Sequence, residues 1–139
     1  MNSLSSFRPR TLVADDAPVV ARQVVEVLQD AGADVIGPAS DGAQALRLWV
    51  EHKPDLAVLD FQMPDLTGLQ VAQAIRAAER QACAQDHCYI VILSSHTEPA
   101  IARQCLVDGA DRFLNKHLDF EHLRDIVAAL VAGQSARPV

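Results

Sequence analysis

The stretch that decides the fold is residues 11–16, TLVADD, followed at once by a segment with apolar side chains at helical spacing. Residues 11–14 form a short apolar run without polar alternation, which is typical of a strand buried on both faces. Pro18 lies where the first turn of a helix tolerates proline, and Gly32 is typical of a helix end. The segment predicts a buried strand that ends at Asp15 and Asp16 and leads into a helix.

The same pattern of apolar run, polar residues and helical segment recurs along the rest of the chain. Further strands are expected at residues 34–40, 56–59, 89–93 and 112–114. Helices are expected at residues 41–52, 68–83, 97–108 and 119–132, with Thr97 and Asp119 as N-caps of the last two. Strict alternation of this kind predicts an α/β fold with a five-stranded parallel sheet and helices on both faces. Gly37-Pro38 favours an edge position for the second strand.

Composition and length bound the class of protein. The chain has 139 residues, which fits one domain at residues 10–132, with a flexible segment at 1–9 and a tail or linker start at 133–139. The net charge is −6 without a basic cluster, which argues against direct nucleic acid binding by this segment. There is no secretion signal and no apolar run near the roughly 18 residues of a membrane span. Three cysteines then predict reduced thiols in the cytoplasm.

Polar residues directly follow four of the five predicted strands. They are Asp15 with Asp16, Asp60, Ser94 with Ser95, and Lys116. Each has an ordinary explanation alone, such as a helix cap, a turn or a solvated surface residue. In a parallel sheet, however, all of these strand ends meet at one edge, where ligands of open sheets bind. Three close carboxylates repel one another and suit a hard cation such as Mg²⁺, while one of them could act as a nucleophile toward phosphorus.

This arrangement resembles the receiver domain of two-component response regulators over about residues 10–132. The matching motifs are LVADD at 12–16, LDFQMP at 59–64 with Gly68, VILSS at 91–95, and GADRFLNK at 109–116. The resemblance implies the CheY-like, flavodoxin-like fold with strand order 2-1-3-4-5. It also implies a function as a phosphoacceptor switch in a phosphorelay, and not as an enzyme acting on other substrates.

By that resemblance, Asp60 would accept the phosphoryl group from a histidine kinase or a phosphotransfer protein. Asp16 would bind Mg²⁺ directly and Asp15 largely through water, with Asp60 and the backbone carbonyl of Gln62 completing the protein ligands. Phosphorylation would then alter the face formed by the fourth helix, the fifth strand and the fifth helix, which would act on an output domain or a downstream protein.

The resemblance also assigns the supporting residues. Lys116 would hold the phosphoryl group. Ser94 would move to hydrogen-bond it, and Phe113 would rotate into the vacated space. Gln62 and His96, two residues beyond Asp60 and Ser94, would tune the phosphoryl lifetime; a solvated loop is the alternative explanation for His96.

The sequence departs from the family pattern in two places that matter. His117 follows Lys116 where the family often has a cis proline, and a cis bond without proline costs about 2.5–4 kcal/mol, so a trans bond is expected. In having no proline after Lys116, the chain is similar to regulators whose usual output is a helix-turn-helix DNA-binding domain. The loop at 80–88 is also a few residues longer than usual.

Three other classes of protein fit the sequence less well. A pseudo-receiver that binds proteins without phosphorylation would not need the complete set of acids, Ser94 and Lys116. A phosphatase with an aspartate nucleophile needs an acid where Gln62 stands, and a nucleotide-binding protein needs a glycine-rich phosphate loop after the first strand.

Two further features have ordinary explanations. Cys83, His87 and Cys88 are poorly spaced for zinc. Ile101, Cys105 and Leu106 could form part of a homodimer face, although apolar helix residues more often belong to the core.

Overall fold

A single parallel sheet organises the computed structural model, which describes residues 7–96 and 98–133. Its strands are ordered β2-β1-β3-β4-β5, as predicted, and every pairing is parallel. The strands are β1 (Arg10–Ala14), β2 (Asp34–Ala39), β3 (Leu56–Asp60), β4 (Tyr89–Ser94) and β5 (Arg112–Asn115). β2 therefore lies at an edge, and β3, which is apolar up to its last residue Asp60, is central and buried throughout.

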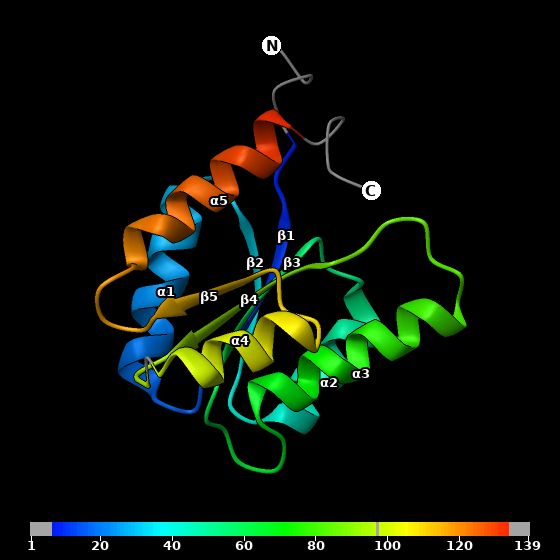
Figure 1. The fold of residues 1–139 in the computed structure, drawn as a ribbon. Coiled ribbons are helices and arrows are strands. Elements are labelled where there is room, and N and C mark those ends of the chain that lie inside the picture. The colour runs from blue at the N-terminus through cyan, green and yellow to red at the C-terminus, as the bar shows by residue number, and fades with distance from the viewer. Residues whose placement is uncertain (1–6, 97, 134–139) are drawn as a thin grey trace.

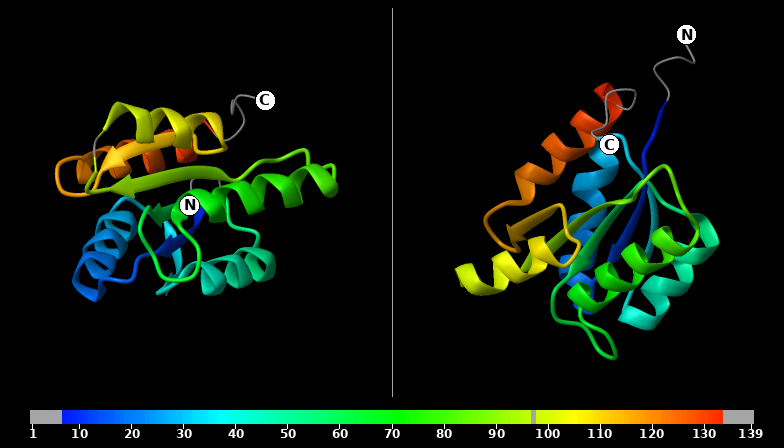
Figure 2. Two further views of the ribbon diagram at one scale, coloured as in Figure 1. Left: turned by 60° about the horizontal axis from the view of Figure 1, so that its bottom comes forward. Right: turned by 45° about the vertical axis from the view of Figure 1, so that its right-hand side comes forward.

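Helices cover both faces of the sheet (Figures 1 and 2). They are α1 (Pro18–Asp30), α2 (Gly42–His52), α3 (Gly68–Gln81), α4 (Pro99–Val107) and α5 (Phe120–Ala132). One core cluster joins α1 and α5 to one face, and a second joins α2, α3 and α4 to the other. None of the helices in the described ranges has the length and apolar character needed to cross a membrane.

Local signals explain most of the helix boundaries. The Asp41 side chain accepts the Gln44 N–H at the start of α2. Thr67 and Gln70 form a reciprocal capping box at the start of α3, in which each side chain accepts the other residue's backbone N–H. Pro18 and Pro99 occupy the first turns of α1 and α4, as predicted.

Two predicted caps require comment. Thr97 lies outside the described residues, and Glu98 occupies the N-cap position of α4 without a side-chain cap bond. Asp119 does occupy the N-cap position of α5, but the prediction that its side chain caps the helix was wrong. Its carboxylate accepts the backbone N–H of Asn115 instead, at 2.7 Å.

Candidate functional site

Three carboxylates converge where β1 and β3 end side by side. Asp60 is the last residue of β3, and Asp15 follows the last residue of the neighbouring β1. One oxygen from each of Asp15, Asp16 and Asp60 lies within 4.8 Å of the other two. Asp15 and Asp60 are each 4% exposed, whereas Asp16 is exposed. The predicted acidic site is therefore assembled with two buried carboxylates and one at its mouth.

Lys116, which directly follows the edge strand β5, brings a buried positive charge to this site. Its Nζ lies 3.0 Å from Asp60 Oδ2 and 3.2 Å from Asp15 Oδ2. Burial acts to lower the pKa of Lys116, but the hydrogen bond that Lys116 donates to Asp60 and the charges of Asp60 and Asp15 outweigh it and raise that pKa. The lysine consequently stays an ammonium between the two carboxylates.

The same surroundings act differently on Asp60. Burial raises the pKa of Asp60 to about 6, against the opposing effect of the hydrogen bond from Lys116. The charge of Asp15 raises this pKa further, while a hydrogen bond from the Gln62 backbone lowers it. Asp60 thus pays a desolvation penalty for its charge that the lysine only partly offsets.

The donor set fits a hard divalent cation. Asp15 Oδ1 accepts the N–H of Ala17 at 2.8 Å, but its buried Oδ2 accepts no hydrogen bond from any described residue. Oδ2 forms an ion pair with Lys116 Nζ at 3.2 Å. An incompletely satisfied carboxylate oxygen beside two further carboxylates is chemistry that Mg²⁺ accommodates, with water filling its remaining positions. The residues present therefore fit Mg²⁺, and Asp15, Asp16 and Asp60 are the groups that would hold it.

Ser94 and Phe113 lie on the adjacent strands β4 and β5. Ser94 is buried, and its Oγ accepts the backbone N–H of His96 at 2.9 Å. Phe113 is half-buried and packs against the core cluster that includes Cys105 of α4. Gln62 and His96 are both exposed on the loops after β3 and β4, and His96 Nδ1 lies 3.9 Å from Glu98 Oε1. Apart from Phe113, which lies within β5 opposite Ile92, the predicted site residues thus lie on strand ends or loops at the same edge of the sheet.

The turn after Lys116 is held by two residues that the sequence analysis did not assign to the site. The Asn115 side-chain oxygen accepts the backbone N–H groups of His117 and Leu118, at 2.8 and 3.0 Å. Asp119 closes the turn by accepting the Asn115 N–H. Among the described residues the only cis peptide bond joins Gly37 and Pro38, so the bond from Lys116 to His117 is trans, as predicted. The sequence signal for this turn was the presence of Asn115 and Asp119 on either side of it, because Asn and Asp side chains often bond to nearby backbone N–H groups in turns.

Gly68 allows α3 to begin directly against the end of β3. Its N–H donates to the Phe61 carbonyl at 2.9 Å, and a Cβ at this position would lie 2.5 Å from the Asp60 carbonyl oxygen. Any larger residue would therefore push the β3–α3 loop and shift Asp60. The presence of glycine at position 68 of the phosphoacceptor motif thus has a steric explanation, since no side chain fits there.

The long loop before β4 does not form a metal site with its cysteines. Cys83 is exposed, whereas Cys88 is buried. His87 Nδ1 lies 3.2 Å from Glu79 Oε1. Within residues 7–96 and 98–133, the aspartates at the strand ends are the only group of three or more His, Cys, Asp or Glu side chains placed to hold a metal ion.

Comparisons with known proteins agree with the fold. The family model for the response regulator receiver domain matches residues 11–128. The transcriptional regulatory protein NarL of Mycobacterium tuberculosis is 39% identical over 144 residues, which cover 96% of this chain and 64% of NarL. The structure of the M. tuberculosis NarL receiver domain has a TM-score of 0.79 at 37% identity, covering 91% of this chain and 98% of that one.

A LuxR-family two-component response regulator from Aurantimonas sp. SI85-9A1 has a TM-score of 0.78 at 26% identity, covering 91% of this chain and 87% of that one. The chain spans somewhat less than two thirds of the length of its NarL relative. The family model covers most of the chain, and the strand order and the acidic site agree with it. The chain belongs to the response regulator receiver domain family and is the receiver domain of a two-component response regulator.

Proposed function

We propose that this receiver is a phosphorylation-controlled switch in which Asp60 accepts a phosphoryl group from a phosphohistidine of a kinase or phosphotransfer protein. The observation that supports this most strongly is the placement of the buried Lys116 ammonium 3.0 Å from Asp60, beside the carboxylates of Asp15 and Asp16. A nucleophile, a fixed positive charge and a cation site thereby share one edge of the sheet. A pseudo-receiver that binds partners without phosphorylation has no comparable use for this set.

In the proposed reaction an Asp60 carboxylate oxygen attacks phosphorus, an acyl phosphate bond forms and the P–N bond of the phosphohistidine breaks. The electron pair of that bond leaves with the imidazole, which takes up a proton. Lys116 exchanges its contact with the Asp60 carboxylate for one with a phosphoryl oxygen and offsets its charge. Bound Mg²⁺, held by Asp15, Asp16, Asp60 and the Gln62 backbone carbonyl, would neutralise charge on the phosphoryl group.

The proposed response passes from Ser94 to Phe113. The Ser94 hydroxyl can donate to a phosphoryl oxygen once it turns toward Asp60, because its oxygen is at present an acceptor for the His96 N–H. Phe113 already packs against the α4 side of the core and can move into space that Ser94 leaves. The acyl phosphate then favours a second conformer of the α4–β5–α5 face. Gln62 and His96, exposed beside the site, would control access of the water that hydrolyses the acyl phosphate.

The α4–β5–α5 face is the proposed contact for an output domain or an effector protein, or for a second copy of the chain. Leu106 is 47% exposed and suits such a contact, whereas Cys105 is fully buried in the core and contributes nothing to the surface. Because NarL is described as a transcriptional regulator, a DNA-binding output is the proposal for the complete protein, acting in the cytoplasm. The receiver itself would not contact nucleic acid.

The first test is the intact mass after incubation with acetyl phosphate, with and without Mg²⁺, for the wild type and the Asp60→Ala variant. We expect a gain of one phosphoryl group that requires both Mg²⁺ and Asp60. The Asp125→Asn variant, which removes an exposed carboxylate on α5, serves as the control and should be phosphorylated like the wild type. Absence of any mass gain in folded wild type would contradict the proposal and favour the pseudo-receiver.

A further inference from the structure

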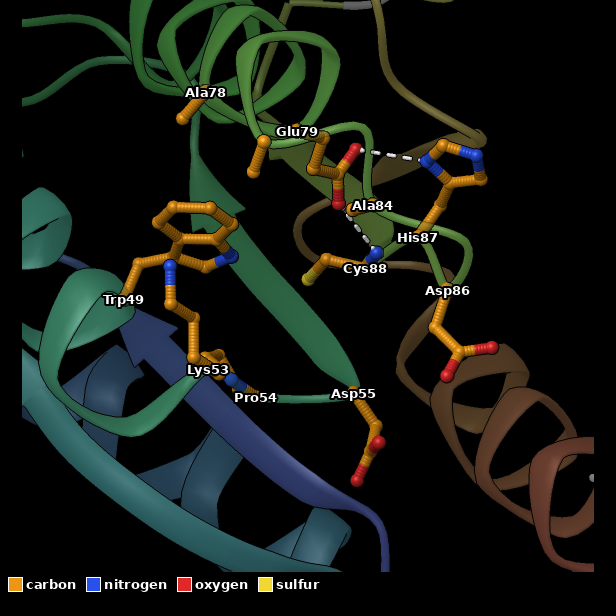
Figure 3. A pocket seen from close by; sticks show the side chains of 11 residues that line it. Trp49, Lys53, Pro54, Asp55, Ala78, Glu79, Ala84, Asp86, His87 and Cys88 are labelled. Carbon is orange, nitrogen blue, oxygen red and sulfur yellow. Dashed lines mark hydrogen bonds and ion pairs between the residues drawn. The ribbon is translucent and has the colours of Figure 1, made fainter.

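A pocket lies at the end of the sheet opposite the acidic site. It has a volume of about 390 Å³ and is formed where α2 leads into β3 and where the loop after α3 leads into β4. Pockets for small molecules have volumes from roughly 300 to 1,000 Å³, so its size suits one small ligand. None of its lining residues belongs to the proposed phosphorylation site (Figure 3).

The pocket has two apolar walls. Trp49 of α2 and Pro54 form one wall, and the methyl groups of Ala78, Ala82 and Ala84 line the other. The Trp49 side chain is almost entirely buried, and its indole N–H, beside the weakly accepting Cys88 thiol, makes no hydrogen bond within the described part of the chain. A ligand could therefore reach the ring face only by displacing the group that covers it.

A cation already sits on that ring face. Lys53 Nζ lies 4.3 Å from the centre of the Trp49 ring, within the range of a cation–π contact. Figure 3 shows the Lys53 side chain extending alongside the indole. The backbone of Lys53 is left-handed, with φ 48°, and the residue is exposed, so the ammonium can leave the ring for solvent. Lys53 thus occupies a cation position without being locked into it.

The remaining charges of the pocket are carboxylates. Asp55 and Asp86 lie at its edge, and Glu79 lies in its wall. The buried Glu79 is rigidly held, because it accepts from Arg76 Nη1 at 2.8 Å and from the Cys88 backbone N–H at 2.7 Å. Arg76 offsets Glu79, and the lining then holds two further carboxylates, one lysine and the imidazole of His87. Such a balance favours cations over anions.

We propose that this pocket binds a small organic cation with an apolar body, whose ammonium replaces that of Lys53 over the Trp49 ring. The apolar body would lie between the indole and the alanine wall, and the carboxylates that line the pocket would favour a positive charge on the ligand over a negative one. Binding moves Lys53 into solvent and leaves the contacts of Glu79 unchanged.

Fluorescence provides a direct test, because Trp49 is the only tryptophan in the chain. The full chain is titrated with benzylamine, and with benzyl alcohol and benzoate as uncharged and anionic probes of matched shape. We expect a saturable change in Trp49 fluorescence with benzylamine at millimolar concentration, a several-fold weaker response to benzyl alcohol, and none to benzoate. Equal responses to benzylamine and benzyl alcohol would overturn the assignment of a cation site.

Variants separate the pocket from a general effect of charge. Lys53→Asn removes the competing cation but tolerates the left-handed backbone, and should tighten benzylamine binding several-fold. Asp86→Asn should weaken it, whereas Asp125→Asn on α5 should leave it unchanged. Asp60→Ala should also bind benzylamine like the wild type, so this site and the phosphorylation site can fail independently. No saturable change in either the wild type or Lys53→Asn, with both folded by circular dichroism, would overturn the proposal.

Discussion

Asp60 combines two demands that oppose each other at a single side chain. A nucleophile in the proposed reaction must be ionised, yet its burial raises its pKa to about 6. Lys116 and the Gln62 backbone N–H favour the charged form, but burial and the nearby Asp15 charge outweigh them. The carboxylate is therefore charged at neutral pH at a cost to stability, and a cation or a phosphoryl group held by Lys116 would change that balance.

Asp60→Asn should raise the stability of the metal-free protein. Between a pKa of 3.8 in the unfolded chain and about 6 in the folded one, the folded state retains a proton that the unfolded state has lost. Stability falls as pH rises through this window and the deficit persists above it. At about 1.4 kcal/mol per pKa unit, and because the raised pKa already includes the opposing interaction with Lys116, we expect a gain of about 1–3 kcal/mol near neutral pH.

Urea unfolding at pH roughly 7.5 and roughly 4 would measure this effect, because the wild-type carboxyl is mostly protonated at the lower value. The gain should shrink to a small fraction at the lower pH, which lies close to the unfolded pKa of 3.8. The control Asp125→Asn should show no gain at either pH. A similar gain for Asp60→Asn at both values would show that the ionisation of Asp60 is not its cause.

His96→Ala should change how quickly the phosphorylated protein loses its phosphoryl group. The ring is exposed on the loop after β4, and the His96 backbone N–H is bonded to Ser94 Oγ. Faster hydrolysis in the variant would indicate that the ring shields the acyl phosphate, and slower hydrolysis would indicate that it orients the attacking water. Decay is followed by intact mass after removal of the phosphodonor. His122→Ala on α5 is the matched control, and equal rates for wild type and His96→Ala would contradict the role.

At the scale of elements, Arg76 joins α3 to the starts of β4 and β5. Its guanidinium contacts Glu79 and the Cys88 carbonyl at 2.8 Å, the Gly109 carbonyl at 2.9 Å, and Asp111 at 2.8 Å. Gly109, with φ 139°, lets the arginine stem approach closely, because a Cβ there would lie 3.0 Å from Arg76 Cγ. This network fixes the end of α3 against the sheet and supports the pocket beside Trp49.

Arg76→Ala should therefore destabilise the fold severely. The change leaves the buried Glu79 carboxylate without its arginine and frees two backbone carbonyls, and breaking a buried ion pair costs about 3–5 kcal/mol. Arg80→Ala, one turn further along α3 at an exposed position, is the matched control and should change stability by less than about 0.5 kcal/mol. Urea unfolding compares the two variants directly. A small loss for Arg76→Ala would mean that Glu79 is neutralised by other groups, His87 among them.

The sequence could predict the strand ends but not the side-chain connections between elements. Apolar runs that stop at Asp15, Asp60, Ser94 and Lys116 lie one after another in an alternating pattern, so topology alone places them together. Arg76 and Asp111 are 35 residues apart, and nothing in their local sequence indicates that they pair. Asp119 likewise could cap α5 or bond backward to Asn115, and that choice depends on the turn that presents Lys116.

At the scale of the whole molecule, the acidic site links metal binding to global stability. Asp15, Asp16 and Asp60 come from segments separated along the chain and gather only when β1 and β3 pair. A cation that needs all three carboxylates would bind the folded state and not the unfolded one. It would also relieve the repulsion that contributes to the raised pKa of Asp60. Metal affinity is therefore expected to appear as thermal stabilisation.

Mg²⁺ should raise the melting temperature of the wild type, in buffer of constant ionic strength. At 100 times its dissociation constant, a ligand specific for the folded state adds about 2.7 kcal/mol of stability. Asp16→Asn should need a higher Mg²⁺ concentration for the same shift, whereas Asp86→Asn, with a carboxylate at the other end of the sheet, should behave like the wild type. Because protons compete for Asp60, the shift should shrink as pH falls below about 6. Equal shifts in all three proteins would assign the effect to general ion binding, since only a site built by the strand ends distinguishes Asp16 from Asp86.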